Sequence, residues 1–202
     1  MKVFATAPGE NWILDRISQE WYLKKQEYST TNILESDIIW LIDGYSWQKI
    51  NTNLLMSKKV VLTVHHVTPN KFNKQDFLIR DQFVDHYHVP CEQTKNFIKE
   101  HTNKPITVIG YWYNEKCWYE MNKQGCRQYL GLPKDDFIIG SFQRDTEGFD
   151  LKTPKLEKGP DLFCDYVERL EKDNLHILLG GWRRQYVISR LEQAGIKYTY
   201  KE

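Results

Sequence analysis

Short, nearly continuous apolar runs recur along the first half of the chain, separated by stretches with helical spacing. The runs lie at 2–7, 37–42, 59–64, 86–89 and 106–109. Helical spacing is found at 12–25, 46–56, 77–83 and 91–101. Apolar runs without alternation are typical of strands buried on both faces of a parallel sheet. Because strands joined through helices form right-handed crossovers, the pattern predicts an α/β fold with a doubly wound, Rossmann-type parallel sheet.

The pattern is interrupted at 111–133, where aromatic residues occur without periodicity and Gly131-Leu132-Pro133 indicates a turn. We therefore predict an N-terminal domain at 1–113, with a linker and second domain at 114–202. Strands are expected in the second domain at 137–142, 176–179 and 197–200, and helices at 161–171 and 184–194. That is about half of a doubly wound domain, so a partial second Rossmann-like domain is expected.

Composition narrows the class of protein. The chain is 41% apolar and 27% charged, and its 28 basic residues nearly balance 27 acidic ones. This balance gives no indication of nucleic acid binding. No apolar run is long enough for an integral membrane segment, and the N-terminus lacks a signal-peptide core, so a cytoplasmic location is expected. The four cysteines form no C-x-x-C pair and have no histidine at metal spacing, which predicts reduced thiols and no metal site.

Two cations stand out in the second half. Arg144 ends an expected strand, and Lys158-Gly159 precedes an expected helix. Fixed cations at the carboxyl ends of parallel strands suit a diphosphate, and a helix N-terminus favours anions. The alternative is that both are solvated surface charges beside acidic loop residues.

Candidate residues in the first half follow the expected strands. Gly9 lies in the loop after the first strand, where a glycine allows close approach to a phosphate, and the alternative is a simple turn. His65 ends the strand at 59–64, at the edge where such folds bind ligands. A neutral imidazole there would donate to a sugar hydroxyl, unless a loop carbonyl already satisfies it. Glu10, Asn11 and Asp43 occupy the same edge, where turn chemistry is the alternative to ligand contact.

An ordered set of segments resembles a GT-B glycosyltransferase of the retaining group 1 (GT4-like) type. The strand that ends in His65 resembles the family strand ending in histidine. The segment at 86–95 resembles the family's strand-to-helix step, with Cys91 where a serine usually begins the helix. The matching second-domain segments are the strand ending at Arg144, Lys158-Gly159-Pro160-Asp161-Leu162 and Leu178-Leu179-Gly180-Gly181.

The resemblance implies a metal-independent, retaining transfer of a sugar from a nucleotide-sugar to a hydroxyl acceptor, without a cofactor. It implies that Arg144 and Lys158 hold the diphosphate, that Gly9 and Gly181 contact the donor, and that His65 assists at the sugar. Glu10, Asn11 and Asp43 would face the acceptor, whether a glycan, a lipid-linked or a small-molecule one.

Two departures from the family keep alternatives open. A long polar insert at 145–157 separates Arg144 from Lys158. The family's glutamate pair would lie beyond the last strand, so the C-terminal half of the donor domain is expected to be missing. The chain would then be a truncated or split nucleotide-sugar-binding module, acting as a homo-oligomer or with a partner chain. A dinucleotide-binding Rossmann protein is disfavoured because no G-x-G-x-x-G follows the first strand.

Overall fold

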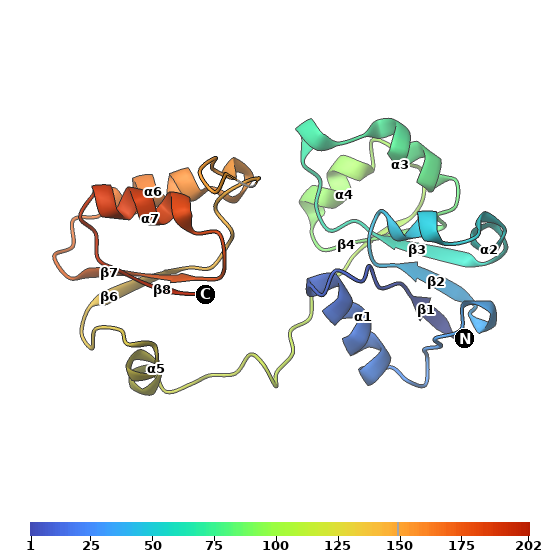
Figure 1. Ribbon diagram of the computed structural model, residues 1–202. Helices are drawn as coiled ribbons and strands as arrows, with labels where there is room; N and C mark the ends of the chain where they lie inside the picture. Colours follow the sequence, from blue (N-terminus) through green and yellow to red (C-terminus); the bar gives the residue numbers. More distant parts are fainter. Residues whose placement is uncertain (149) are drawn as a thin grey trace. The chain divides into compact units, whose positions relative to one another are not determined.

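The computed structural model describes residues 1–148 and 150–202 and divides into two compact units, Met1–Asn114 and Glu115–Glu202. Each unit has its own parallel sheet with helices packed against it (Figure 1). In the described part of the chain no helix is both long and apolar enough to cross a membrane.

The first unit holds a five-stranded sheet in the order β1-β2-β3-β4-β5. Its strands are β1 (Val3–Ala5), β2 (Ile38–Leu41), β3 (Lys59–Thr63), β4 (His86–Val89) and β5 (Ile106–Val108). Its α-helices are α1 (Ile13–Lys24), α2 (Thr52–Ser57), α3 (Lys74–Asp81) and α4 (Glu92–Ile98). Three 3₁₀ turns complete it: η1 (Ile33–Glu35), η2 (Ser46–Lys49) and η3 (Pro69–Lys71).

One parallel β-bridge outside the named strands shows that this sheet is doubly wound. Ser29 pairs in parallel with Val3 on the side of β1 away from β2. The connection from β1 through α1 therefore runs in the direction opposite to the connections through α2, α3 and α4. Right-handed crossovers running in opposite directions place their helices on opposite faces, and α1 lies on the face opposite α3 and α4 (Figure 1). The topological switch point, where such folds bind ligands, is thus at β1.

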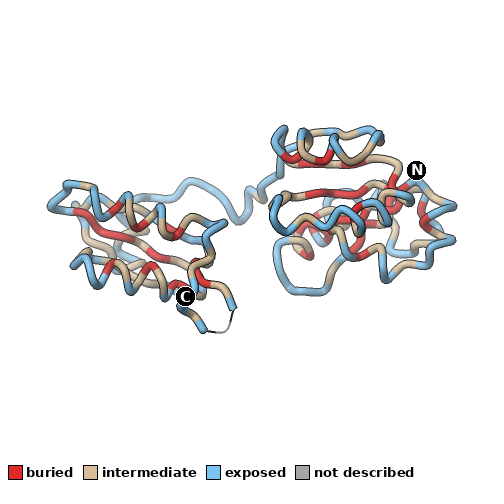
Figure 2. Tube along the Cα trace, turned by 90° about the horizontal axis from the view of Figure 1, so that it is seen from above, coloured by how far each residue is buried: buried red, intermediate tan, exposed pale blue. Residues whose placement is uncertain are grey.

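The two faces of the first sheet pack differently. Ile39, Leu62 and Tyr87 are fully buried beneath α2, α3 and α4, whereas α1 covers the opposite face only near β1 and β2. Farther along that opposite face, His86 and His88 are half-buried on β4. The expectation of strands buried on both faces is therefore wrong for β4. Figure 2 shows the buried residues concentrated along the strands and the inward faces of the helices.

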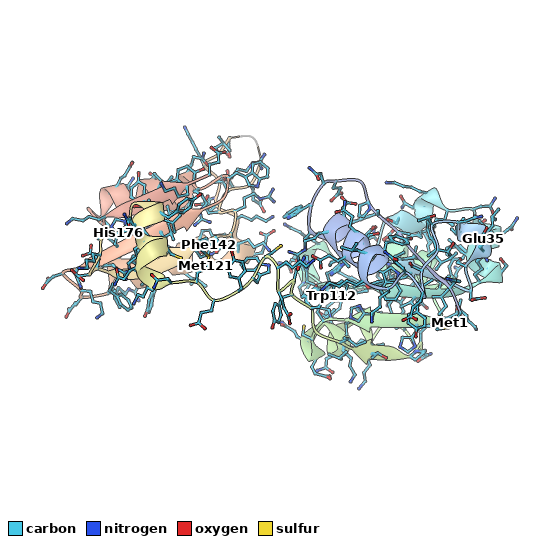
Figure 3. The ribbon with its side chains drawn as sticks, turned by 90° about the horizontal axis from the view of Figure 1, so that it is seen from below. Met1, Glu35, Trp112, Met121, Phe142 and His176 are labelled. Atoms are coloured by element: carbon cyan, nitrogen blue, oxygen red, sulfur yellow. The ribbon has the colours of Figure 1, made fainter. Side chains whose placement is uncertain are left out.

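The second unit is a three-stranded sheet in the order β6-β7-β8, with α6 and α7 on one face (Figure 1). Its strands are β6 (Phe137–Ser141), β7 (Leu175–Gly180) and β8 (Tyr198–Lys201). Its helices are α5 (Lys123–Leu130), α6 (Pro160–Glu168) and α7 (Gln185–Gln193), with the 3₁₀ turn η4 (Leu156–Lys158). On the other face, the ring of Phe142, a residue labelled in Figure 3, lies against Gly140 and Gly180, where an added Cβ would come within 2.7 Å of it.

Two elements differ from the sequence prediction. The helix expected at 46–56 is split into η2 and α2, because the Asn51 side chain accepts from Asn53 N–H and starts a new helix. Helix α5 was not predicted. It begins where Asn122 accepts from Gly125 N–H and ends at Gly131, whose φ of 69° provides a left-handed cap.

Candidate functional site

Arg144 and Arg183 meet on one exposed indole at the carboxyl edge of the second sheet. The guanidinium carbon of Arg183 lies 4.4 Å from the ring centroid of Trp182, and that of Arg144 lies 5.8 Å away. Trp182 is 52% exposed. Arg183 has a φ of 57°, a conformation that costs about 1 kcal/mol or more outside glycine. Gly181, at φ 82°, makes the turn that leads to this pair.

A buried pair of opposite charges lies immediately after these cations in the chain. Asp145 is fully buried and Arg184 is 1% exposed. Asp145 accepts from Val187 N–H at 2.9 Å, which caps α7, and Arg184 donates to Ser141 Oγ at 2.6 Å. Asp145 N–H also donates to the Arg183 carbonyl. Burial raises the pKa of Asp145, although the Val187 N–H and the Arg184 charge oppose that shift. The buried pair therefore ties together the two loops that carry Arg144 and Arg183.

Lys158 is exposed at the end of η4, directly before α6. Gly159 follows with a φ of 63° and precedes Pro160, and as the N-cap residue it has no side chain to cap the first N–H groups of the helix. In the described part of the chain Arg144 contacts Trp182, and no contact joins Arg144 to Lys158. The insert between them is pinned at its base, because Thr146 pairs with Pro154 and Lys155 N–H donates to the Asp145 carbonyl.

The Gly9 loop is occupied by a carboxylate of its own chain. Gly9, at φ 81°, donates its N–H to Asp15 Oδ1 at 2.8 Å. This bond, with further backbone N–H groups from Glu10 to Trp12, lowers the pKa of the buried Asp15 carboxyl, against the effect of burial. The negative charge that the loop attracts is thus supplied by Asp15 in the first turn of α1.

Asp43 serves the turn after β2. Its Oδ1 accepts from the backbone N–H groups of Tyr45 and Ser46, and its Oδ2 accepts from the Ser46 hydroxyl. The side chain is buried, so the turn uses it as an internal cap. Glu10 and Asn11 are exposed in the β1 loop, and Asn11 has a φ of 55°.

His65 has a partner on each ring nitrogen. Nε2 lies 2.7 Å from the Ile42 carbonyl and Nδ1 lies 2.8 Å from the Tyr111 hydroxyl. Because a carbonyl only accepts, Nε2 carries the proton. Burial lowers the pKa of His65, although the Ile42 carbonyl opposes the shift, so the ring is neutral and Nδ1 accepts from Tyr111. The outward-facing polar atom of this pair is therefore the Tyr111 oxygen, which is not evident from the sequence.

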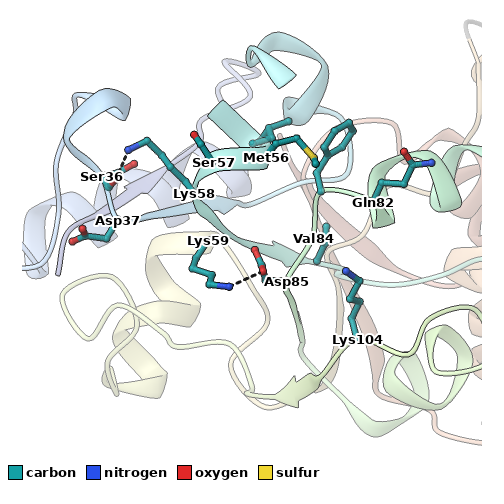
Figure 4. A pocket seen from close by; sticks show the side chains of 12 residues that line it. Ser36, Asp37, Met56, Ser57, Lys58, Lys59, Gln82, Val84, Asp85 and Lys104 are labelled. Carbon is teal, nitrogen blue, oxygen red and sulfur yellow. Dashed lines mark hydrogen bonds and ion pairs between the residues drawn. The ribbon is translucent and has the colours of Figure 1, made fainter. Parts of the chain in front are cut away.

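Pockets lie at both edges of the first sheet. One, of about 470 Å³, lies at the amino edge, where Lys58 bonds the Ser36 carbonyl and Lys59 pairs with Asp85 (Figure 4). Another, of about 440 Å³, lies at the carboxyl edge beside Tyr45, His66 and Arg80. A third, of about 330 Å³, lies at the same edge beside Thr6, Ala7 and Lys49. Ligands of doubly wound folds bind at the carboxyl edge, and the pocket beside Arg80 is the functional candidate because it is the larger of these two and holds a fixed guanidinium. Sequence reasoning missed Arg80, which lies on a surface helix without a recognisable motif.

Among the described residues, no group of three or more His, Cys, Asp or Glu side chains is arranged to hold a metal ion. The described cysteines are all free thiols.

No protein-family model and no curated protein sequence matches the chain. Among solved structures, it is similar to Anabaena Alr3699/HepE, crystallised in complex with UDP and glucose, with a TM-score of 0.65 and 10% identity. The similarity covers 98% of this chain and 68% of that one. The GtfA/B complex is matched at a TM-score of 0.48 and 14% identity, over 93% of this chain and 38% of that one. The Gap123 complex from Streptococcus agalactiae is matched at 0.41 and 15%, over 92% and 37%.

The similarity to HepE confirms the predicted fold class. The chain has a GT-B-like α/β fold, with a doubly wound parallel sheet in the first unit and a partial Rossmann-like second unit.

Proposed function

We propose that this chain is a nucleotide-sugar-dependent glycosyltransferase, in which residues 114–202 bind the donor and residues 1–113 bind the acceptor. The observation that carries this proposal is the cluster of Arg144 and Arg183 on Trp182 at the carboxyl edge of a GT-B-like sheet. Guanidinium groups bind phosphate oxygens through paired hydrogen bonds, and an exposed aromatic ring offers a stacking surface. A nucleoside diphosphate presents both complementary groups.

Cleavage of the donor leaves negative charge on a diphosphate oxygen. In the proposed mechanism Arg144 and Arg183 stabilise that charge, and Lys158 adds a cation beside the first N–H groups of α6. Gly181 allows the donor to approach the backbone. With protein cations in this role, transfer needs no metal and no cofactor, and the family resemblance favours retention at the anomeric carbon.

His65 is proposed to act with Tyr111 at the sugar. Because Nδ1 already accepts from the Tyr111 hydroxyl, the phenolic oxygen is the acceptor available to a sugar hydroxyl. Glu10, Asn11 and Asp43 are proposed to shape the acceptor side, with Asp43 acting through the turn that it caps. The reduced cysteines favour action in the cytoplasm on a glycan, lipid-linked or small-molecule acceptor.

The first test is release of nucleoside diphosphate from a panel of UDP-, GDP- and ADP-hexoses, with and without EDTA. We expect one donor to be hydrolysed or transferred, with an unchanged rate in EDTA, and Lys158→Ala to lower the rate by about 100-fold. Lys197→Ala, an exposed cation before β8, is the matched control and should be silent.

Full turnover by Lys158→Ala would show that Lys158 does not act in donor cleavage. Binding of a nucleotide-sugar without any turnover is the result expected of a nucleotide-sugar-binding module that needs a partner chain. Absence of binding across the whole panel would contradict both.

A further inference from the structure

The carboxyl-edge pocket of the first unit has an apolar floor and a charged wall. Val64, Phe77 and Ile98 form the floor and are buried. The charged wall includes Arg80 on α3 and Lys71 at the end of η3. The volume of about 440 Å³ lies in the range of pockets that bind small molecules.

Arg80 is held rigidly. Its Nη1 donates to Asp76 at 2.8 Å, its guanidinium carbon lies 5.2 Å from the Phe77 ring centroid, and its side chain is only 14% exposed. Gly44 makes room for it, since a Cβ at that position would lie 3.2 Å from Nη1. Arg80 Nε is buried and meets no acceptor within the described residues. A guanidinium fixed in this way keeps its planar set of donors oriented for a carboxylate or phosphate.

The remaining lining suits a sugar ring. Tyr45 lines the pocket with 74% of its surface exposed, and Phe72 is a second aromatic residue of the lining. Aromatic rings of this kind pack against the apolar face of a sugar, while Gln48 and His66 offer hydrogen-bonding groups at the same pocket. Among these lining residues, Arg80 offers a donor for an anion, because its Nε meets no acceptor within the described residues. The pocket therefore favours a ligand that combines a sugar ring with a negative charge.

We infer that this pocket binds an acceptor sugar that carries an anionic group, a carboxylate or a phosphate, with Arg80 as the residue that selects the charge. The acceptor role rests on the proposed function, whereas the binding itself does not require it. Tyr45 provides the stacking surface, and Asp76 positions Arg80.

The test is an NMR titration of the ¹⁵N-labelled full chain, without donor, using methyl glucuronide, glucose 1-phosphate and methyl glucoside. We expect the backbone signals of residues 44–48 and 66–80 to shift with the two anionic sugars, and methyl glucoside to bind at least about tenfold more weakly. Whichever anionic sugar binds more tightly identifies the charged group. Arg80→Gln should remove the preference for charge, and Lys74→Gln, an exposed cation on the same helix, should leave it unchanged.

Because Tyr45 is exposed, we expect Tyr45→Ala to fold, so this variant tests the pocket even if Arg80→Gln does not fold. It should weaken the charged and neutral sugars alike, by about fivefold. Equal binding of methyl glucoside and methyl glucuronide, an unchanged preference in Arg80→Gln, or no shift around the pocket would each overturn the inference. If the pocket fails while nucleotide-sugar turnover persists, only this inference falls. If the pocket binds but no donor is turned over, the transferase function falls and the sugar site stands.

Discussion

The two units each place a carboxylate against backbone N–H groups at the start of a helix, but they do so in opposite electrostatic surroundings. In the first unit, Asp15 accepts from Gly9, and these N–H groups lower its pKa. In the second, Asp145 accepts from Val187 and has a raised pKa because burial outweighs that bond and the Arg184 charge. The motif is similar, and the depth of burial reverses the pKa shift.

The difference separates a structural cap from a binding edge. The 7–11 loop of the first unit has no cation in its own sequence, Lys49 donates to its Pro8 carbonyl at 3.3 Å, and Asp15 accepts from its Gly9 N–H. In the second unit Asp145 lies beside a buried guanidinium, while Arg144 and Arg183 remain at the surface on Trp182. A helix start at a strand end is therefore not enough to mark a phosphate site. Cations left at the surface beyond the internal cap distinguish the second edge.

The largest effect should come from the buried charges. Asp145→Ala removes the acceptor of Val187 N–H and the carboxylate charge that acts on the buried Arg184, and it should lower the free energy of unfolding by about 3 kcal/mol, measured by urea denaturation. The double variant Asp145→Ala/Arg184→Met should lose less than the sum of the two single variants, because each single change strands the other charge. Additive losses would show that the two groups do not interact.

Asp15→Ala tests whether the Gly9 loop is internally satisfied. The loss of the cap should cost about 1–2 kcal/mol by the same measurement. Millimolar phosphate should recover part of the loss in the variant and stabilise the wild type little, since the freed N–H groups would accept an external anion. Glu10→Ala, in the same loop, is the control. The opposite result would be that phosphate stabilises the wild type and no longer stabilises Asp15→Ala. Asp15 would then be needed for an external anion to bind, and its carboxylate would not occupy the loop in place of that anion.

Glu20 anchors the segment at the end of the first unit. It accepts from Trp112 Nε1 at 2.7 Å and Asn114 Nδ2 at 3.0 Å (Figure 3 labels Trp112). Burial alone would raise the pKa of Glu20, but these bonds and the Arg16 charge lower it below its usual 4.5. Its stabilising contribution is therefore present above pH 4.5 and is lost as the pH falls through the lower folded-state pKa.

Glu20→Gln should cost about 1 kcal/mol near neutral pH and flatten the acid limb of the stability profile. Thermal unfolding between pH 3 and 7 measures the loss of stability and the slope of the acid limb. Glu27→Gln, at an exposed position shortly after α1, is the control. If the acid limb of the variant were identical to that of the wild type, Glu20 would not contribute to the pH dependence of stability.

His65 should give the smallest effect. Burial holds its folded-state pKa below 6.5, so the fold favours the neutral ring. That contribution is complete above pH 6.5 and declines as the pH falls below it, because the unfolded chain takes up the proton more readily. His65→Gln should reduce the loss of stability between pH 7 and 5, measured by urea denaturation at each pH. A steeper loss in the variant would contradict the neutral assignment.

Periodicity located the strands well but located the polar contacts poorly. The strand at 86–89 coincides with β4, where the buried Tyr87 and Val89 alternate with half-buried histidines. Helix α5 escaped prediction because its exposed surface gives little apolar spacing, although Asn122 and Gly131 mark its ends. The site was harder. His65 meets Tyr111 across 46 positions and Glu20 meets Trp112 across 92. Such pairings depend on how the strands are ordered, which no local pattern contains.

The central claim is that the carboxyl edge of the second sheet binds a nucleotide-sugar through Trp182 and its two arginines. The most direct measurement follows the indole ¹⁵N–H signal of Trp182, assigned with Trp182→Phe, while UDP-glucose and other nucleotide-sugars are titrated into the full chain. The account predicts that one donor shifts this signal saturably, and that Arg144→Gln and Arg183→Gln each weaken binding by about tenfold or more. A Trp182 signal that stays fixed with every donor, or that shifts equally in both arginine variants, would contradict it.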